Sequence, residues 1–105
     1  MFARHITMQM KKNFDKEFPT VFETEVLPIL RRQKGFLEEM LFISPMKNEA
    51  VAISLWEEKE HAEAYHRQVY PDVAKIVAKY VEETPVVKNF DVNYATYRKF
   101  ATVAA

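Results

Sequence analysis

Hydrophobic and polar residues alternate along the first ten positions of the chain. A period of two is typical of a strand with one buried face, so we predict a strand over residues 2–10. Arg4 interrupts the apolar side, and we expect it near an exposed end of the strand. The apolar side carries Phe2, Ile6, Met8 and Met10, and the polar side carries Ala3, His5, Thr7 and Gln9.

Hydrophobic residues then recur at helical spacing over two longer stretches, residues 14–30 and 58–80. This spacing predicts two helices, each with one apolar face. Gly35 is placed to end the first helix in a left-handed turn. Pro71 lies inside the second stretch and should divide that helix into two segments.

Shorter runs of apolar and β-branched residues predict three more strands, over residues 36–43, 50–56 and 89–94. The resulting β-α-β-β-α-β order favours a ferredoxin-like α+β fold with a four-stranded antiparallel sheet in the order 4-1-3-2. Both helices would cover one face of the sheet. Residues 1–105 would form a single domain, and its bare sheet face, carrying Trp56, would pair with a second copy in a homodimer.

The amino-acid composition excludes several classes of function. Hydrophobic residues make up 49% of the 105 positions and aromatic residues 13%, enough for a core and for a further buried surface such as an interface or a pocket. Fifteen basic residues balance fifteen acidic ones, so nucleic acid is not expected as a partner. The absence of Cys excludes disulfides and thiolate metal sites. With neither a signal-like start nor an apolar stretch of about 20 residues, we expect a cytoplasmic protein and no membrane partner.

The polar faces of the strands hold the candidate chemistry. In the predicted strand order, His5 and Thr7 would lie beside Asp91, with Ser54 and Trp56 on their other side. A carboxylate that fixes the tautomer of a histidine makes it a better general base, so His5 and Asp91 are candidate catalytic residues. The alternative is that these side chains line a wet dimer interface, because such alternation is ordinary in antiparallel sheets.

Aromatic residues of the two predicted helices are the other candidates. Tyr65 could act in proton transfer, and His66 and Phe22 could edge a substrate pocket together with Trp56 and Thr7. Tyr65 lies within the apolar stripe of its helix, so a place in the core is the alternative. His61 and His66 are five residues apart and do not share a helix face, so we expect no metal site there.

Several segments together resemble the antibiotic biosynthesis monooxygenase domain family. They are residues 54–65 (SLWEEKEHAEAY), Tyr70-Pro71, the strand in 85–92, and the run from Leu27-Pro28 to Gly35-Phe36. The resemblance spans nearly the whole chain. It implies a dimeric α/β barrel and places the protein among cofactor-independent monooxygenases of aromatic compounds, haem-degrading enzymes and small proteins without assigned function.

The haem-degrading branch of that family is disfavoured. It requires an axial histidine on the second helix, where this chain has Val73-Ala74-Lys75-Ile76-Val77. It also requires an asparagine on the first strand, where the nearest polar residues are His5 and Thr7. The resemblance therefore implies a protein that works without a cofactor.

Two hypotheses follow. The first is a small cofactor-independent monooxygenase acting on an aromatic or quinoid molecule in a pocket between helices and sheet. The second is a non-catalytic dimeric barrel that binds a small hydrophobic ligand or serves as an interaction module. A polyketide or quinone pathway encoded beside the gene would favour the first.

Overall fold

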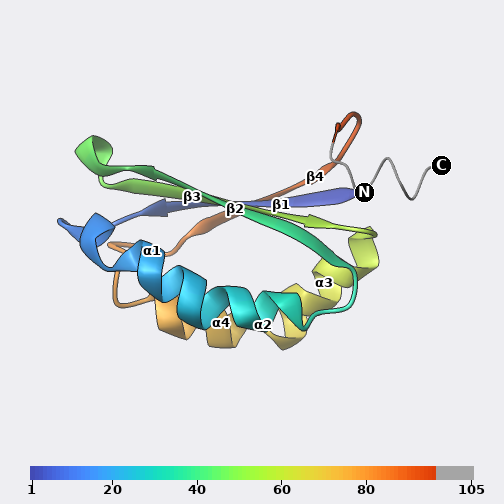
Figure 1. Ribbon diagram of the computed structural model, residues 1–105, viewed down its shortest axis with the longest axis horizontal. Helices are drawn as coiled ribbons and strands as arrows, with labels where there is room; N and C mark the ends of the chain where they lie inside the picture. The colour runs from blue at the N-terminus through green and yellow to red at the C-terminus, as the bar shows by residue number, and fades with distance from the viewer. Residues whose placement is uncertain (97–105) are drawn as a thin grey trace.

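The computed structural model describes residues 1–96 of the chain. Its helices lie side by side on one face of a twisted antiparallel sheet, and they leave the other face bare (Figure 1). The elements follow in the order β1 (Phe2–Gln9), η1 (Phe14–Lys16), α1 (Phe18–Val21), η2 (Phe22–Val26), α2 (Leu27–Arg31), β2 (Phe36–Ser44), η3 (Pro45–Lys47), β3 (Glu49–Trp56), α3 (Lys59–Gln68), α4 (Tyr70–Val77) and β4 (Val86–Asp91).

The sheet has the strand order β2-β3-β1-β4, which confirms the predicted ferredoxin-like arrangement. The β1 strand is central and pairs antiparallel with both β3 and β4. The β2 strand forms the far edge and pairs with β3, with a bulge between Phe36 and Glu38. This bulge shifts the alternation of β2 by one residue, so Phe36 and Glu39 face the same side of the sheet.

The helix-covered face of the sheet carries the core. Buried and partly buried positions alternate along β3 without exception, as expected when one face packs under helices. The most deeply buried side chains come from both layers, and they include Trp56, Phe18, Met10, Leu30 and Val26.

Trp56 belongs to this covered face, which corrects the prediction that it lies on the bare face. It has no solvent exposure and stands opposite Phe2 in the sheet. Ring contacts with Phe36 and Tyr65, at centroid distances of 5.6 and 5.2 Å, hold it between the sheet and α3. The bare face is instead formed by the other set of positions, which include Met40, Phe42, Ile53, Val86 and Phe90.

The first predicted helix is continuous in space but irregular in its hydrogen bonding. A π-helical turn, η2, separates α1 from α2, and the Leu27 N–H reaches back five residues to the Phe22 carbonyl. Pro28 follows directly and has no N–H to continue a regular ladder. The extra residue in this turn keeps Phe22 and Val26 buried while Glu25 is exposed.

The second predicted helix is divided as expected. The α3 helix ends at Gln68, and α4 begins at Tyr70 with Pro71 in its first turn. Val69 between them leaves helical geometry, with φ −122° and ψ −38°. The break turns Tyr65 and Tyr70 toward the same interior region, where their ring centroids are 6.2 Å apart.

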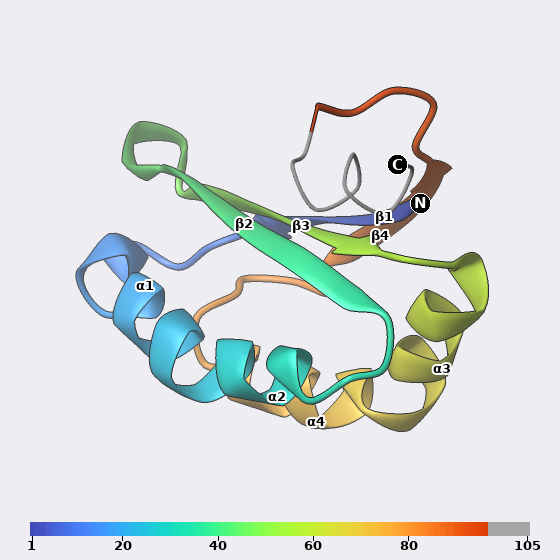
Figure 2. The ribbon, with the colours of Figure 1, turned by 45° about the vertical axis from the view of Figure 1, so that its right-hand side comes forward.

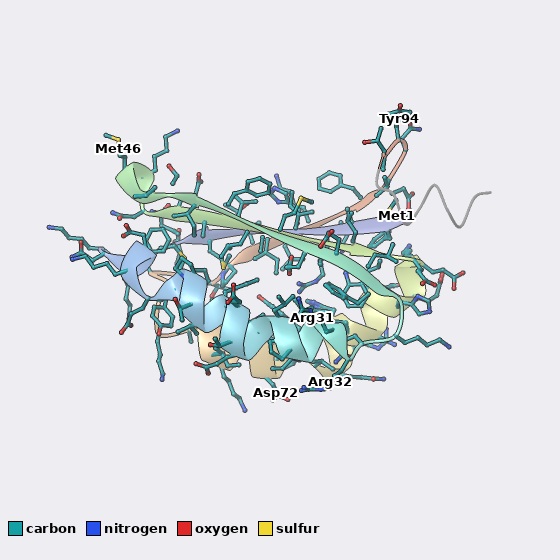
Figure 3. The ribbon with its side chains drawn as sticks, in the orientation of Figure 1. Met1, Arg31, Arg32, Met46, Asp72 and Tyr94 are labelled. Atoms are coloured by element: carbon teal, nitrogen blue, oxygen red, sulfur yellow. The ribbon has the colours of Figure 1, made fainter. Side chains whose placement is uncertain are left out.

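Strand β4 lies three residues earlier than predicted, since it begins at Val86 and ends at Asp91 rather than continuing to Tyr94. The chain then turns to the bare side of the sheet, where Tyr94 projects away from the helices (Figure 3). In the same view Met46 marks the tip of the β2–β3 hairpin, at the opposite end of the sheet. No helix within residues 1–96 has the length and apolar character needed to span a membrane.

Candidate functional site

A row of polar residues crosses all four strands on the helix-covered face. Glu39 of β2 stands opposite Ser54 of β3, Ser54 opposite Arg4 of β1, and Arg4 opposite Asn89 of β4. Directly opposite residues of antiparallel strands project to the same side of the sheet. The row therefore places a cation, a hydroxyl and a carboxyl group beneath the helices, while the amide of Asn89 at the β4 edge is exposed.

Arg4 is the centre of this row, with only 2% of its surface exposed. Its guanidinium carbon lies 4.2 Å from the ring centroid of Tyr70 and 5.2 Å from that of Tyr65. Its Nη2 atom is 3.0 Å from Nδ1 of His66. A guanidinium only donates hydrogen bonds, so Nδ1 of His66 accepts and the imidazole is neutral with its proton on Nε2.

The prediction that Arg4 lies near an exposed end of its strand is wrong. The α3–α4 segment covers this end of β1 and encloses the side chain with aromatic rings. Burial lowers the pKa of the Arg4 guanidinium, while the charges of Tyr65, Tyr70 and Glu39 act in the opposite direction. The group stays cationic because its ordinary pKa is so high, and its Nε atom is buried without a hydrogen-bond partner.

Glu39 is the second ionisable group of the row. Its Oε1 atom is buried and has no hydrogen-bond partner. Burial raises the pKa of the Glu39 carboxyl to about 8, against smaller lowering effects of the Met40 backbone N–H and the Arg4 charge. A carboxyl group with this pKa exchanges its proton near neutral pH, as a general acid or base must.

Ser54, Trp56 and Tyr65 complete the wall of the site. The Trp56 indole N–H donates to the Ser54 hydroxyl at 2.9 Å, which satisfies both groups in the interior. Burial raises the pKa of the Tyr65 phenol well above its ordinary value, so this group stays protonated at neutral pH. Tyr65 can therefore donate a hydrogen bond into the site.

A narrow cavity of about 20 Å³ lies among these groups, between the sheet and the helices. Its polar lining consists of Arg4, Glu39, Ser54, Tyr65 and Tyr70. Its apolar lining comes mainly from the helices and includes Phe22, Val26, Leu30, Val73 and Val77. We call this cavity the inner pocket. In the free chain it holds little more than a water molecule, so a larger ligand requires the helices or side chains to move.

A second, open cavity of about 430 Å³ lies between α3 and the β1–β4 side of the sheet. We call it the outer cleft, and its lining includes Phe2, Arg4, Glu63, His66, Arg67 and Asn89. Arg4 lines both cavities, and its hydrogen bond to His66 lies at the wall between them. His66 stacks on Tyr70 at a centroid distance of 5.4 Å, and burial followed by the Arg4 charge lowers the pKa of its imidazole.

The structure separates His5 from Asp91, which corrects the predicted pairing. Asp91 stands opposite Phe2 on the helix-covered side, whereas His5 stands opposite Ile53 and Lys88 on the bare face. The odd-numbered residues of β4 share the side of Arg4, because the register pairs Asn89 with Arg4. Within residues 1–96 no carboxylate therefore orients His5, whose ring instead meets Phe90 edge-on at 6.2 Å.

The other predicted site residues divide between the two faces. Tyr65 and Phe22 line the inner pocket, and His66 lines the outer cleft. Trp56 packs behind Tyr65. Thr7 lies on the bare face opposite Val51 and Val86, so the predicted juxtaposition of Thr7 with Trp56 is also wrong. Among residues 1–96, no three His, Asp or Glu side chains come together as a metal site would require.

Sequence reasoning missed Arg4, Glu39 and Tyr70. A charged residue on the apolar side of a predicted strand was the available indication for Arg4, since the two-residue period already assigned it to the buried face. Glu39 gave no such indication, because the bulge near Phe36 shifts the alternation of β2. Tyr70 precedes a proline at the start of a helix, where its direction depends on the angle between α3 and α4.

A sheet covered on one face by helices, with buried polar groups beneath them, defines a small α+β protein with a site between its two layers. The chain belongs to the antibiotic biosynthesis monooxygenase family, whose family model matches residues 1–82. This confirms the resemblance found in the sequence. Among curated proteins, none matches the sequence.

Solved structures share the fold at low sequence identity. A cofactor-independent oxygenase of Streptomyces nogalater, SnoaB, is 17% identical with a TM-score of 0.74, over 92% of this chain and 97% of that chain. A monooxygenase of Streptomyces coelicolor, solved in complex with nanaomycin D, is 15% identical with a TM-score of 0.70, over 90% and 88%. A protein of unknown function from Nitrosomonas europaea is 11% identical with a TM-score of 0.75, over 90% and 91%.

Proposed function

We propose that this protein is a cofactor-independent monooxygenase that oxidises an aromatic or quinoid molecule in the inner pocket. The observation that carries the proposal is the set of polar groups buried beneath the helices, where apolar packing would otherwise be expected. Buried polar groups without partners lower stability, so a site that keeps them is a candidate for ligand binding. Membership of the monooxygenase family and the likeness to SnoaB support this assignment.

The reaction proposed needs a base and a place for negative charge. A base removes a proton from an activated CH₂ group, and the resulting carbanion adds to O₂ to form a C–O bond. Protonation gives a hydroperoxide. Removal of the second proton from the same carbon then forms the C=O bond and breaks the O–O bond, so CH₂ and O₂ yield C=O and water. The substrate supplies all four electrons, and no metal or organic cofactor takes part.

We also propose that the protein acts as a homodimer joined through the bare face of the sheet, as the family resemblance implies. Large apolar side chains on this face are strongly exposed: Phe42 and Phe90 each at 51%, and Val86 at 54%. They come from both edge strands, β2 and β4, which flank the sheet in Figure 2. A second copy would bury this face. His5 and Thr7, which lie on it, would then be interface residues.

The second candidate function is a non-catalytic barrel that binds a hydrophobic ligand. One observation favours it: the inner pocket of about 20 Å³ has no room for an aromatic ring unless the protein opens. The two functions differ in oxygen consumption.

An oxygen electrode with an anthrone as substrate tests the proposal, with heat-denatured protein as the blank for autoxidation. We expect oxygen uptake and formation of the anthraquinone without added metal or flavin. Ala52→Leu should fill the inner pocket and lower the rate by about 10²-fold, because it removes the space needed to position the substrate. Ala78→Leu, at an exposed position of the helix layer, is the matched control. Binding without oxygen uptake would favour the non-catalytic barrel.

A further inference from the structure

Arg4 and Glu39 lie in one cross-strand row and both line the inner pocket, yet they do not pair with each other. Only Ser54 stands between them in the sheet. Neighbouring strands are about 4.8 Å apart, so two strand spacings place their backbones roughly 10 Å apart. Two long side chains could span this distance, but within residues 1–96 no ion pair joins them.

Each of these two side chains keeps a buried polar atom without a partner. They are Nε of Arg4 and Oε1 of Glu39. An unpaired buried donor or acceptor lowers stability, and the loss is larger when the group is charged. The simplest way to satisfy both is a ligand that presents an acceptor to Arg4 and a donor to Glu39.

The surroundings specify the rest of that ligand. Between the two polar ends, the inner pocket is lined by apolar and aromatic side chains from the helices, among them Phe22 and Val73. These suit a flat hydrophobic ring system rather than a sugar or an amino acid. The Tyr65 and Tyr70 rings hold the Arg4 guanidinium in place, so its charge is fixed before the ligand arrives.

We propose that the inner pocket binds an aromatic hydroxyl compound as its phenolate, with Arg4 as the partner of the oxygen anion and Glu39 as the acceptor of the proton. The O–H bond of the ligand breaks, its electron pair stays on the oxygen beside Arg4, and the proton moves to the Glu39 carboxylate. Charge is conserved within the site. In the oxidation proposed above, on which this inference builds, the same two residues would bind the enolate oxygen of the substrate and receive the proton from carbon.

The groups facing Glu39 support this role. Burial opposes the ionisation of Glu39 most strongly. The Arg4 charge, from β1, favours the ionised carboxylate, and the charge of Glu38, which lies on β2 beside Glu39, disfavours it. Tyr65 on α3 feels the charge of Glu39, and with Tyr70 on α4 completes the ionisable surroundings. The resulting pKa near 8 leaves enough carboxylate at neutral pH to act, and the acid it becomes is strong enough to return the proton.

Binding of 2-naphthol at about pH 7.5 tests the proposal without any turnover, because this phenol is un-ionised in neutral solution and its naphtholate absorbs at longer wavelength. We expect the difference spectrum of the wild-type complex to be that of the naphtholate. Glu39→Gln and Arg4→Met should each lower the share of bound naphtholate by about 10-fold or more, since each removes one of the two partners. The ether 2-methoxynaphthalene, which cannot ionise, should bind equally to all three proteins.

Matched controls make the test specific. Glu63→Gln and Arg67→Met change an exposed carboxylate and an exposed arginine of the outer cleft; both should keep the naphtholate spectrum. If Arg4→Met does not fold, Arg4→Lys, which keeps the charge but not the planar fork, should retain part of the naphtholate. A neutral naphthol spectrum in the wild-type complex, or no binding at all, would overturn the proposal. So would a naphtholate spectrum that persists in Glu39→Gln.

The outcome separates this inference from the proposed function. Naphtholate formation that depends on Arg4 and Glu39, together with no oxygen uptake from any anthrone, would retain the phenolate site and reject the monooxygenase. Oxygen uptake that is unchanged in both variants would retain the monooxygenase and reject the site.

Discussion

Individual residues of the interior explain why this small core tolerates polar groups. Trp56 and Ser54 satisfy each other through the indole N–H, and His66 satisfies one nitrogen of Arg4. Hydrogen-bonded polar pairs cost little in the interior, whereas single unpaired atoms are expensive. Four buried side-chain atoms of the described residues lack a partner: Nε of Arg4, Oε1 of Glu39, and Nδ1 of His5 and of His61. Arg4 and Glu39 also line the inner pocket, and that combination marks the site.

The Trp56–Ser54 hydrogen bond provides a first prediction. Ser54→Ala should lower the free energy of unfolding by about 1–3 kcal/mol, because it leaves a buried indole N–H without an acceptor. Trp56→Phe should cost about 1–3 kcal/mol through the lost volume, less than a truncation to alanine. Once the indole donor is absent, removal of the Ser54 hydroxyl leaves no unpaired group. The double variant should therefore lose less free energy of unfolding than the two single variants together. Urea unfolding measures this, and strict additivity would contradict it.

The raised pKa of Glu39 gives a second prediction. Its folded value of about 8 exceeds the value of about 4.3 for an unfolded glutamate, so between these values the folded state holds a proton that the unfolded state has lost. Stability should therefore fall as the pH rises from about 5 to about 8. Glu39→Gln cannot ionise and should lack this part of the decline. Urea unfolding at both ends of the range tests it, and an identical decline in both proteins would refute it.

At the scale of elements, the order and pairing of strands were predictable and the register of the last strand was not. Hydrophobic periodicity is clear in long segments, so the predicted bounds of β1 and of the helices are close to the observed ones. The β4 strand alternates polar and large apolar residues, and a shift of one residue exchanges its faces. We assumed that Asp91 would join the polar side of β1. Instead Phe90 lies on the bare face opposite Ala3, and Asp91 lies on the helix-covered side opposite Phe2.

The connection from α2 to β2 provides an element-scale prediction. Gly35 has φ +81°, and a Cβ atom at this position would overlap the His61 ring. Gly35→Ala should therefore lower stability by about 2 kcal/mol or more, through backbone strain and the clash. In a His61→Ala background the overlap with the ring is lost, and the strain and a contact with the remaining Cβ, 2.7 Å away, are left, so the same substitution should cost less. Thermal unfolding of the four proteins measures both parts, and an equal cost in both backgrounds would exclude the clash.

For the whole molecule, the proposed dimer provides the clearest prediction. Light scattering of the wild type at about micromolar concentration should give twice the chain mass of 12.4 kDa. Phe42→Asp and Phe90→Asp should each shift the protein toward monomer, because a charge buried in an apolar interface loses its hydration. Met46→Asp, at a hairpin tip that is 98% exposed, should have no effect. A wild-type monomer would reject the dimer.

One arginine serves two cavities, and this has a kinetic consequence. Arg4 lines both the inner pocket and the outer cleft, so an anion in the cleft and an anion in the pocket compete for one guanidinium. At a high concentration of a phenolic substrate, a second molecule bound in the outer cleft would compete for Arg4 with the molecule bound in the inner pocket. Rates should then rise, pass through a maximum and decline as substrate increases. The charge that binds the reactant in the inner pocket would therefore also cause inhibition by excess substrate.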